Sequence, residues 1–373
     1  MNAVNIALSR RLRASPFEGR SNIGVKAASV YNHIVLPTIY HSLQDDYWHL
    51  RENVQIWDVA CQVQVEIKGT DALKLVQYLT PREISTCVPG QCMYAPLIDF
   101  RGGIINDPII LCLAEDRYWL SVSDSDVLFW VKGIATGLGL DVEICDPGAH
   151  PLSIQGPKSD TLLNRLIETP TTDIRFFRFI QTEIDGIDVL VARTGWSGQG
   201  GFEIYLTDPQ KGIQLWDFIC SQGSDLDLRT GCPNLIDRIE AGLLSFGNDM
   251  TLDNNPMEVG LDRFFKLGKK SEYLGRDALE TICREGVSQR LIRVFAKDQD
   301  LQNPRTTYRT RINDTDLPGC ITSISYSPRL GGSVGFGFVP ADMTAIGTEI
   351  WIETAGAEWL GKIANENWFT DSL

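Results

Sequence analysis

Apolar and polar residues alternate along residues 61–69 (CQVQVEIKG). A period of two is typical of a strand with one buried face. Residues 70–79 (TDALKLVQYL) change to apolar positions three and four apart, which predicts a helix capped by Thr70 or Asp71. This stretch therefore predicts a strand followed by a helix.

The same order of elements is predicted twice more. Residues 151–156 (PLSIQG) favour a strand, and Pro157 suits the first turn of a following helix. Residues 186–195 and 201–206 favour strands, and 210–223 (QKGIQLWDFICSQG) favour a helix. The core positions expected in these two helices are Leu162, Leu163, Leu166, Ile213, Trp216 and Ile219. The predicted fold class is α+β.

The pattern changes after residues 271–286 (SEYLGRDALETICREG). Short strand-like runs broken by Gly and Pro follow: RLIRVFA, GCITSISYSP, GGSVGFGFVP, TEIWIETAG and EWLGKIA. Such runs predict a small sandwich or barrel. We therefore expect two domains, residues 1–286 with an internal break near 150, and residues 287–373.

Composition supports an ordinary soluble protein with 43% hydrophobic and 22% charged residues. No apolar run approaches the roughly 20 residues that cross a bilayer, and the start lacks the apolar core of a secretory signal. We expect a cytoplasmic protein with no membrane partner. The basic stretch 9–20 (SRRLRASPFEGR) is predicted to be a surface arm rather than a transit peptide.

A net charge of −14 argues against nucleic acid, whose phosphates require a basic face. An anionic ligand would need a local basic pocket. The nine cysteines contain no C-x-x-C and the four histidines have no tight ligand spacing, so we expect free thiols and no metal site.

Residues 193–206 (RTGWSGQGGFEIYL) hold four glycines. Their spacing matches neither of the common phosphate-binding loops, which argues against a nucleotide site. A hairpin places Phe202 and Ile204 in the core and turns Glu203 and Tyr205 to the opposite face. An acid and a phenol on that face can hydrogen-bond a flat polar heterocycle.

Four motifs occur in a characteristic order: GQCMYAPLIDFRGGIINDPII, RTGWSGQGGFEIYL, RIEAGLLSFGNDM and GCITSISYSPRLGGSVGFGFVP. Together they resemble the folate-dependent aminomethyltransferase family, whose best-known member is the T-protein of the glycine cleavage system. The resemblance extends from about Tyr31 to the last strands. It implies a clover-like folate-binding region of two α/β subdomains, a C-terminal β-barrel, and tetrahydrofolate in the central channel.

The resemblance also assigns roles to individual residues. It places the pterin-binding carboxylate at Glu203, where paired hydrogen bonds from the pterin N–H groups can be accepted. Tyr94, Phe177 and Tyr205 match positions that line the same channel, although Phe177 is equally consistent with core packing. Arg238, in RIEAG, is expected to form an ordinary ion pair.

Asn106 departs from the family pattern. The glycine cleavage protein carries two successive acids in the segment that resembles GGIINDP, and the first is its catalytic aspartate. Here Asn106 takes that place and only Asp107 remains. An amide cannot take up a proton as a carboxylate does, so aminomethyl transfer is disfavoured. The candidate catalytic positions are Tyr205, Asn106 and Asp107.

One branch of the family, the dimethylsulfoniopropionate demethylases, is more similar still. The resemblance rests on stretches that include GVKAASVYNHIVLPTIY, QIWDVACQVQVEIKG, IRFFRF and CPNLIDRIEAGLLSFGNDMT. It implies methyl transfer from the sulfonium to N5 of tetrahydrofolate, giving methylmercaptopropionate and 5-methyltetrahydrofolate. A sulfonium already carries an activated methyl group, so this transfer needs alignment more than a strong acid or base.

A fixed positive sulfonium is attracted to aromatic faces. The candidates for this contact are Tyr31, Trp196 and Tyr205, and Trp196 is equally consistent with an aromatic residue covering the core. Lys26, or Ser121 and Ser123, are candidates for the substrate carboxylate, and the sequence does not choose between them.

Three alternatives remain open at this point: an aminomethyltransferase like the T-protein, a tetrahydrofolate-dependent demethylase of another onium or methoxy compound, and a non-catalytic folate-binding protein of the same fold. A homodimer is plausible for each.

Overall fold

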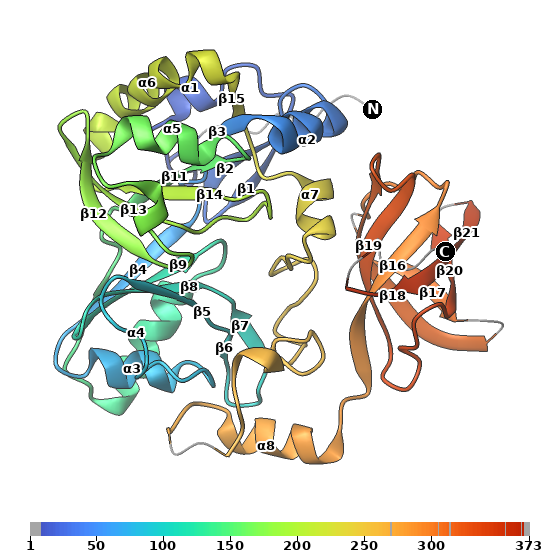
Figure 1. Cartoon of the computed structure of the whole chain (residues 1–373). Helices are drawn as coiled ribbons and strands as arrows, with labels where there is room; N and C mark the ends of the chain where they lie inside the picture. The colour runs from blue at the N-terminus through green and yellow to red at the C-terminus, as the bar shows by residue number, and fades with distance from the viewer. Residues whose placement is uncertain are drawn as a thin grey trace.

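The computed structural model describes residues 9–268, 271–304, 306–312, 315–354, 356–366 and 368, with only the backbone described for 315–318. Three lobes surround a centre in Figure 1: a sheet with helices at the top, a second sheet with helices below it, and a barrel at the side. A long connection that contains α7 and α8 lies between the two sheets and the barrel. The predicted α+β class with a C-terminal barrel is confirmed.

The upper lobe is built on a six-stranded sheet. Its strands, in spatial order, are β12 (Phe179–Ile184), β13 (Ile187–Ala192), β14 (Gly201–Leu206), β11 (His150–Gln155), β3 (Val54–Asp58) and β15 (Leu228–Gly231). Neighbours are antiparallel except β15, which runs parallel to β3. One face is covered by helices α1 (Glu18–Ser21), α5 (Ser159–Leu166) and α6 (Gly212–Gln222).

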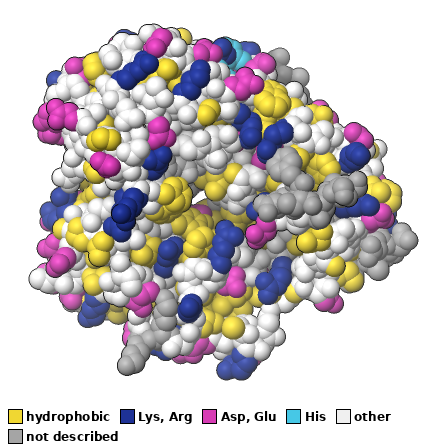
Figure 2. Space-filling view, viewed as in Figure 1, with side chains coloured by type: hydrophobic (Ala, Val, Ile, Leu, Met, Phe, Trp, Pro, Cys, Tyr) yellow, Lys and Arg dark blue, Asp and Glu magenta, His cyan; other side chains and the backbone are white. Residues whose placement is uncertain are grey.

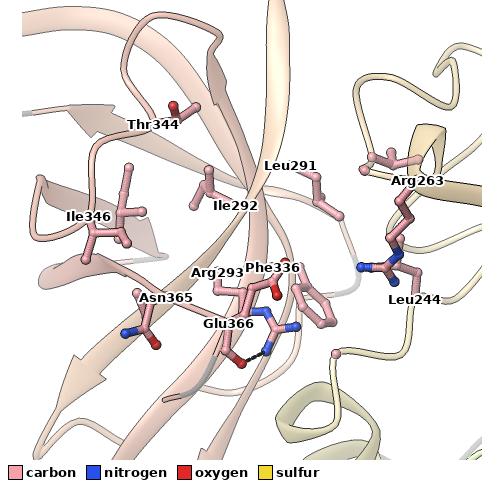
Figure 3. Close-up of a pocket in the computed structure, with 15 residues that line it drawn as sticks. Leu244, Arg263, Leu291, Ile292, Arg293, Phe336, Thr344, Ile346, Asn365 and Glu366 are labelled. Atoms are coloured by element: carbon pink, nitrogen blue, oxygen red, sulfur yellow. Dashed lines mark hydrogen bonds between the residues drawn. The ribbon is translucent and has the colours of Figure 1, made fainter. Parts of the chain in front are cut away.

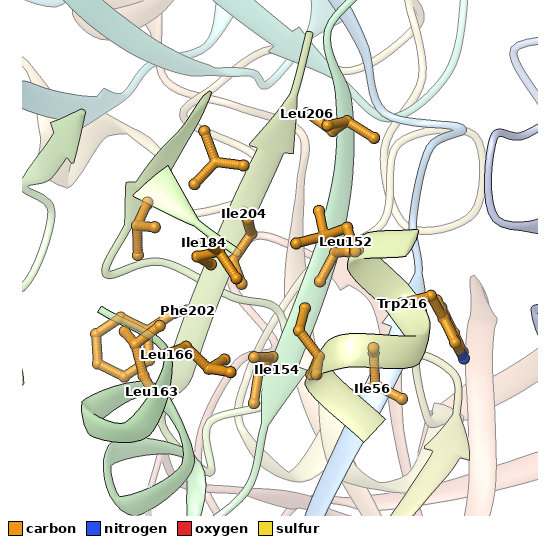
Figure 4. Close-up of a cluster of buried hydrophobic side chains, with 14 of the residues drawn as sticks. Ile56, Leu152, Ile154, Leu163, Leu166, Ile184, Phe202, Ile204, Leu206 and Trp216 are labelled. Carbon is orange, nitrogen blue, oxygen red and sulfur yellow. The ribbon is translucent and has the colours of Figure 1, made fainter. Parts of the chain in front are cut away.

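Alternation along the strands decides which side chains enter the core of this lobe. Phe202, Ile204 and Leu206 of β14 pack with α5 and α6 in one buried cluster (Figure 4). The three leucines predicted for α5 are in this cluster, as are Trp216 and Ile219 of α6. Ile213 is only half-buried, because Leu215 takes the core position instead.

The lower lobe is built on a five-stranded antiparallel sheet. Its strands, in spatial order, are β10 (Glu143–Cys145), β4 (Val63–Lys68), β9 (Arg117–Val122), β8 (Ile109–Ala114) and β5 (Gln91–Tyr94). Helices α3 (Ala72–Tyr78) and α4 (Val127–Leu138) bury their apolar faces against it.

The predicted side-chain cap of α3 is wrong. Asp71 occupies the capping position, but its carboxylate makes no hydrogen bond within the helix. Its Oδ2 instead accepts the backbone N–H of Asp141 at 2.9 Å. Asp141 comes from a segment 70 residues later, so a tertiary contact has replaced the local one that the sequence favoured.

Four short strands and two helices complete the sheet-forming part of the chain: β1 (Ala27–Tyr31), β2 (Ile34–Ile39), α2 (Leu43–Glu52), β6 (Leu97–Ile98), β7 (Ile104–Asn106) and α7 (Leu235–Glu240). β1 pairs with β2 through a turn at Asn32 and His33, which both have positive φ. The 3₁₀ turn η4 (Asp262–Phe264) and helix α8 (Arg276–Glu285) lie on the way to the barrel.

The C-terminal lobe is a closed barrel. Its strands, in spatial order, are β16 (Gln289–Lys297), β19 (Gly332–Pro340), β18 (Thr315–Ser327), β17 (Tyr308–Ile312), β20 (Glu349–Thr354) and β21 (Ala357–Ala364). Five of them match the predicted runs. β17 (YRTRI) was not predicted, because Arg309 and Arg311 interrupt its apolar pattern.

The basic stretch near the N-terminus is not simply a surface arm. Phe17 is completely buried in the upper core and stacks near Trp216, with ring centroids 6.0 Å apart. Arg13 forms an ion pair with Asp146 at 2.8 Å. The arm is held down because the large apolar side chain of Phe17 fills the core beside α6.

A buried ion pair joins the connection to the barrel. The guanidinium of Arg238 on α7 contacts Asp249 and donates to Ser323 Oγ on β18 at 2.6 Å. The predicted ion pair of Arg238 is therefore confirmed, but both partners are almost fully buried. Loss of one partner would leave an uncompensated buried charge, which costs far more than loss of a surface pair.

None of the described helices is long and apolar enough to span a bilayer.

Candidate functional site

Glu203 lies at the centre of the facing sheets. It belongs to β14, on the face opposite Phe202 and Ile204, and only 3% of it is exposed. Its Oε2 accepts hydrogen bonds from Thr194 Oγ1 at 2.5 Å and from the Tyr205 hydroxyl at 3.3 Å. Burial raises the pKa of Glu203, while hydrogen bonds from Thr194, Gln62 and Tyr205 oppose the rise. None of the ion pairs between described residues includes Glu203, and a buried carboxylate in this setting suits a neutral ligand that brings N–H donors.

Tyr205 and Ser121 lie beside this carboxylate. Tyr205 is fully buried, and its ring is 6.1 Å from that of Trp119 on β9, in the facing sheet. Ser121, also on β9, is hydrogen-bonded to Tyr205 and accepts Gln64 Nε2 at 3.2 Å. The two sheets thus contribute residues to one polar centre.

Phe177 belongs to the same centre. It packs with Trp119, Cys92 and Tyr205 and has a positive φ of 57°. Its backbone connects two motifs, since its N–H donates to Arg193 O at 3.1 Å and its carbonyl accepts Cys92 N–H at 2.9 Å. Left-handed backbone at a bulky residue persists only where its surroundings hold it.

Tyr94 and Asp107 form a second group. The Tyr94 hydroxyl donates to Asp107 Oδ2 at 2.7 Å, and the Tyr94 ring meets Phe264 of η4 edge-on at 5.1 Å. Burial raises the pKa of Asp107 to about 7, although the Tyr94 hydrogen bond lowers it in part. A carboxyl with this pKa can accept or release a proton near neutral pH.

Asn106 holds a neighbouring loop rather than pointing at Asp107. Its Nδ2 donates to Asp124 O at 2.9 Å and to Ser125 Oγ at 3.3 Å, and the residue is completely buried. Its Oδ1 has no hydrogen-bond partner among the described residues. Asp124 in turn accepts the N–H of Asn32 at 3.0 Å. The loop after β9 is thereby fixed to the β1–β2 turn, and this arrangement requires an N–H donor at position 106.

The remaining candidates are spread around this centre. Tyr31 ends β1 and is half-buried against a small apolar cluster. Trp196 is half-buried, with the guanidinium of Arg238 5.8 Å from its ring. Ser123 is exposed next to Asp124. Lys26 is exposed, and its Nζ donates to His41 O at 2.5 Å.

The glycine-rich loop around Trp196 is shaped by close packing. Gly201 has φ of +147°, and a Cβ there would overlap the carbonyl oxygen of Ile154. Ser197 donates to Gln155 Oε1 at 2.6 Å. The glycines therefore let the loop lie against β11.

Two residues at Glu203 escaped the sequence argument. Thr194 lies in the quoted glycine-rich motif, so its hydroxyl was a visible signal. Gln62 gave no such signal, because it comes from the start of the first predicted strand, about 140 residues before Glu203.

No group of three or more possible metal ligands exists in the described part of the chain.

The chain matches two family descriptions. Residues 18–269 match the GCVT N-terminal domain, and residues 291–369 match the glycine cleavage T-protein C-terminal barrel domain. The chain therefore belongs to the glycine cleavage T-protein (aminomethyltransferase) family. Its fold is that of the aminomethyltransferase T of Bartonella henselae, with a TM-score of 0.84 and 22% identity over 96% of this chain and 98% of the other.

Two relatives differ in how similar they are. Dimethylsulfoniopropionate demethylase DmdA of Ruegeria pomeroyi is 43% identical over 352 residues, which is 94% of this chain and 96% of that protein. An aminomethyltransferase of Clostridium botulinum is 31% identical over 342 residues, 90% of this chain and 91% of the relative. The demethylase is thus the more similar of these two over nearly the whole length.

Proposed function

We propose that this protein is a tetrahydrofolate-dependent demethylase that transfers a methyl group from the sulfonium of dimethylsulfoniopropionate to N5 of tetrahydrofolate. The products are methylmercaptopropionate and 5-methyltetrahydrofolate. The observation that carries the proposal is the amide of Asn106, whose bond to the Asp124 carbonyl leaves no place for the family's catalytic carboxylate. The 43% identity to the demethylase of R. pomeroyi supports the same substrate.

The folate side of the site rests on Glu203. Its carboxylate accepts the N–H groups of the pterin, and Thr194 holds one of its oxygens in place. Tyr94, Phe177 and Tyr205 line the space around the folate. Burial raises the pKa of Glu203, and hydrogen bonds from the pterin donors favour its charged form and so oppose this rise.

The methyl transfer balances as a direct displacement. The N5 lone pair attacks the methyl carbon while the carbon–sulfur bond breaks, and its electron pair stays on sulfur as the neutral sulfide. N5 then carries an extra proton, which must leave. Asp107, with its pKa raised to about 7, accepts it. Tyr205 and Asn106 help to hold the reactants in place. Alignment of N5 with the methyl carbon supplies most of the rate acceleration.

The sulfonium is held by aromatic faces, for which Tyr31, Trp196 and Tyr205 are assigned. The carboxylate of the substrate is assigned to Ser121 and Ser123 or to Lys26. Ser121 is favoured among these because it already lies beside Tyr205, whereas Lys26 is engaged with the carbonyl of His41. The proposal also includes a cytoplasmic location and a homodimer. It divides the chain into two domains, residues 1–286 and residues 287–373.

The test is an anaerobic incubation of the purified protein with dimethylsulfoniopropionate and tetrahydrofolate, with glycine betaine as a parallel methyl donor. Mass spectrometry follows 5-methyltetrahydrofolate and methylmercaptopropionate. Equal amounts of both products, and none from glycine betaine, are expected. Folate binding without either product would reject the proposed donor.

A further inference from the structure

The loop at residues 194–201, which contains Trp196, has little stiffness of its own. Four of its residues are glycines with positive φ, and such residues leave a backbone free to adopt many conformations. β11 holds one side of the loop, because Ser197 donates to the side chain of Gln155 and the carbonyl of Gly200 accepts a backbone N–H at 3.1 Å. The position of Trp196 therefore depends on what holds the other side.

Helix α7 holds that other side. Gln199 Nε2 donates to Asp237 Oδ1 at 2.9 Å. A Cβ on Gly198 would lie 2.7 Å from the side chain that follows α7, so the backbone of the loop lies close against the helix. The guanidinium of Arg238 is 5.8 Å from the centre of the Trp196 ring. Three neighbouring positions of the loop thus contact one short helix.

The helix is itself fixed to the barrel and to the upper lobe. The Glu240 carboxylate accepts Ser327 Oγ of β18 at 2.6 Å and the Tyr47 hydroxyl of α2 at 3.0 Å. Arg238 also lies 5.6 Å from the ring of Phe336 on β19, which Figure 3 shows on the side of the barrel that faces the connection. In the space-filling view the lobes meet around a central hollow (Figure 2). α7 is therefore a firm support for the loop.

Asp237 is a buried carboxyl that the methyl transfer does not use, and only 1% of it is exposed. Its Oδ1 accepts Gln199 and, at 3.4 Å, Arg51 Nη1 of α2, whereas Oδ2 has no hydrogen-bond partner among the described residues. Burial raises the pKa of Asp237 to about 7, Arg51 lowers it, the carboxylate of Glu240 raises it, and the hydrogen bond from Gln199 lowers it. The bond from Gln199 is stronger when this carboxyl is charged.

We propose that Asp237 is a positioning residue that holds the glycine-rich loop through Gln199, so that the ring of Trp196 stays in place to receive the sulfonium. This rests on the proposed function, in which Trp196 is assigned to the sulfonium. Without the contact the loop spends less time in the binding arrangement, and the apparent affinity for the substrate decreases by that fraction. The chemical step of the bound complex is unaffected.

The test uses the full chain with Asp237→Asn and Gln199→Leu. Asp237→Asn should fold, because about half of Asp237 is already neutral near pH 7. With saturating tetrahydrofolate at pH 8, each variant should raise KM for dimethylsulfoniopropionate about tenfold, the effect of one hydrogen bond to a charged group, with kcat and KM for tetrahydrofolate within about twofold. The double variant should be no worse than either single variant, since all three remove the same contact.

Hydrogen exchange followed by mass spectrometry gives a second readout. Peptides that cover residues 194–201 should exchange faster in both variants than in the wild type. Exchange is measured without any substrate, so its result stands whichever methyl donor is correct. Gln214→Leu is the matched control, because Gln214 Nε2 donates to Asp185 Oδ2 at 3.0 Å on the exposed surface of the same lobe. It should change neither KM nor the exchange of the loop.

The pH profile separates Asp237 from its surroundings. The charged side chains near it are Arg51, Arg238 and Glu240, with Arg329 of the barrel in contact with Glu240. A proton on Asp237 weakens the bond from Gln199, so the wild-type KM for dimethylsulfoniopropionate should increase as the pH falls from 8 to 6 and approach that of Asp237→Asn, whose KM should stay flat.

Three results would overturn the proposal. The first is unchanged exchange of the loop in both variants. The second is faster exchange with an unchanged KM for dimethylsulfoniopropionate, because the loop would then move without affecting the substrate. The third is an equal rise in KM for tetrahydrofolate, because the contact would then support the folate site and not the position of Trp196.

Discussion

Replacement of Asn106 by aspartate tests why this chain lacks the family's acid. The amide nitrogen donates two hydrogen bonds, to Asp124 O at 2.9 Å and to Ser125 Oγ at 3.3 Å, inside a fully buried site. In Asn106→Asp an oxygen would face the Asp124 carbonyl oxygen. A buried polar group without its partner costs about 1–3 kcal/mol, and more when it is charged.

The expected destabilisation at pH 8 is therefore about 2–4 kcal/mol. The introduced carboxyl has a raised pKa because it is buried beside a carbonyl. Below that pKa it is protonated and donates one hydrogen bond, so the loss should be smaller at pH 5.5 than at pH 8. Methyl transfer should decrease, because the loop after β9 and the attached β1–β2 turn are released.

Urea unfolding at both pH values measures the stability, and product formation measures the activity. Asn248→Asp is the matched control, since Asn248 is exposed and donates to Ser245 Oγ at 2.9 Å. An Asn106→Asp variant as stable as the control at pH 8 would refute the reasoning. So would a stable variant that gained aminomethyl transfer.

Three other substitutions have defined outcomes. Glu203→Gln should raise KM for tetrahydrofolate about 10–100-fold, because the amide NH2 group would face the N–H donors of the pterin. An unchanged KM in steady-state kinetics would show that Glu203 does not bind the pterin. Asp107 has a pKa raised to about 7, so the folded protein keeps a proton that the unfolded chain has lost, and wild-type stability should decrease as the pH rises from about 4 to 7. Asp107→Asn should make stability, measured by denaturant unfolding, depend less on pH, and it should slow methyl transfer. Part of the pH dependence should remain, because the pKa of Asp237 is also raised to about 7. An unchanged pH dependence would argue against the raised pKa of Asp107. Phe17→Ala should cost about 3–5 kcal/mol in thermal unfolding because Phe17 is fully buried, and an unchanged melting temperature would show that the N-terminal arm is not anchored there.

Some features followed from local pattern and some did not. The two faces of β14 were predictable, because alternation sends Phe202 and Ile204 to one side and Glu203 to the other. The strand β17 was not, since its arginines face outward and closure of the barrel, rather than an apolar run, holds it in place. The burial of Phe17 was not predicted for a related reason: a single large apolar residue buried inside a basic stretch gives no periodic signal.

The sequence by itself determined the family motifs, the faces of the sheets and helices, and the absence of an acid at Asn106. Only the tertiary structure decided that Asn106 donates to the loop after β9, and that the guanidinium groups of Arg82 and Arg263 meet at the ring of Phe264. The physical reason is the range of the interactions. Burial patterns follow from neighbours along the chain, whereas hydrogen bonds and unpaired charges depend on segments that only the complete fold brings within a few ångströms.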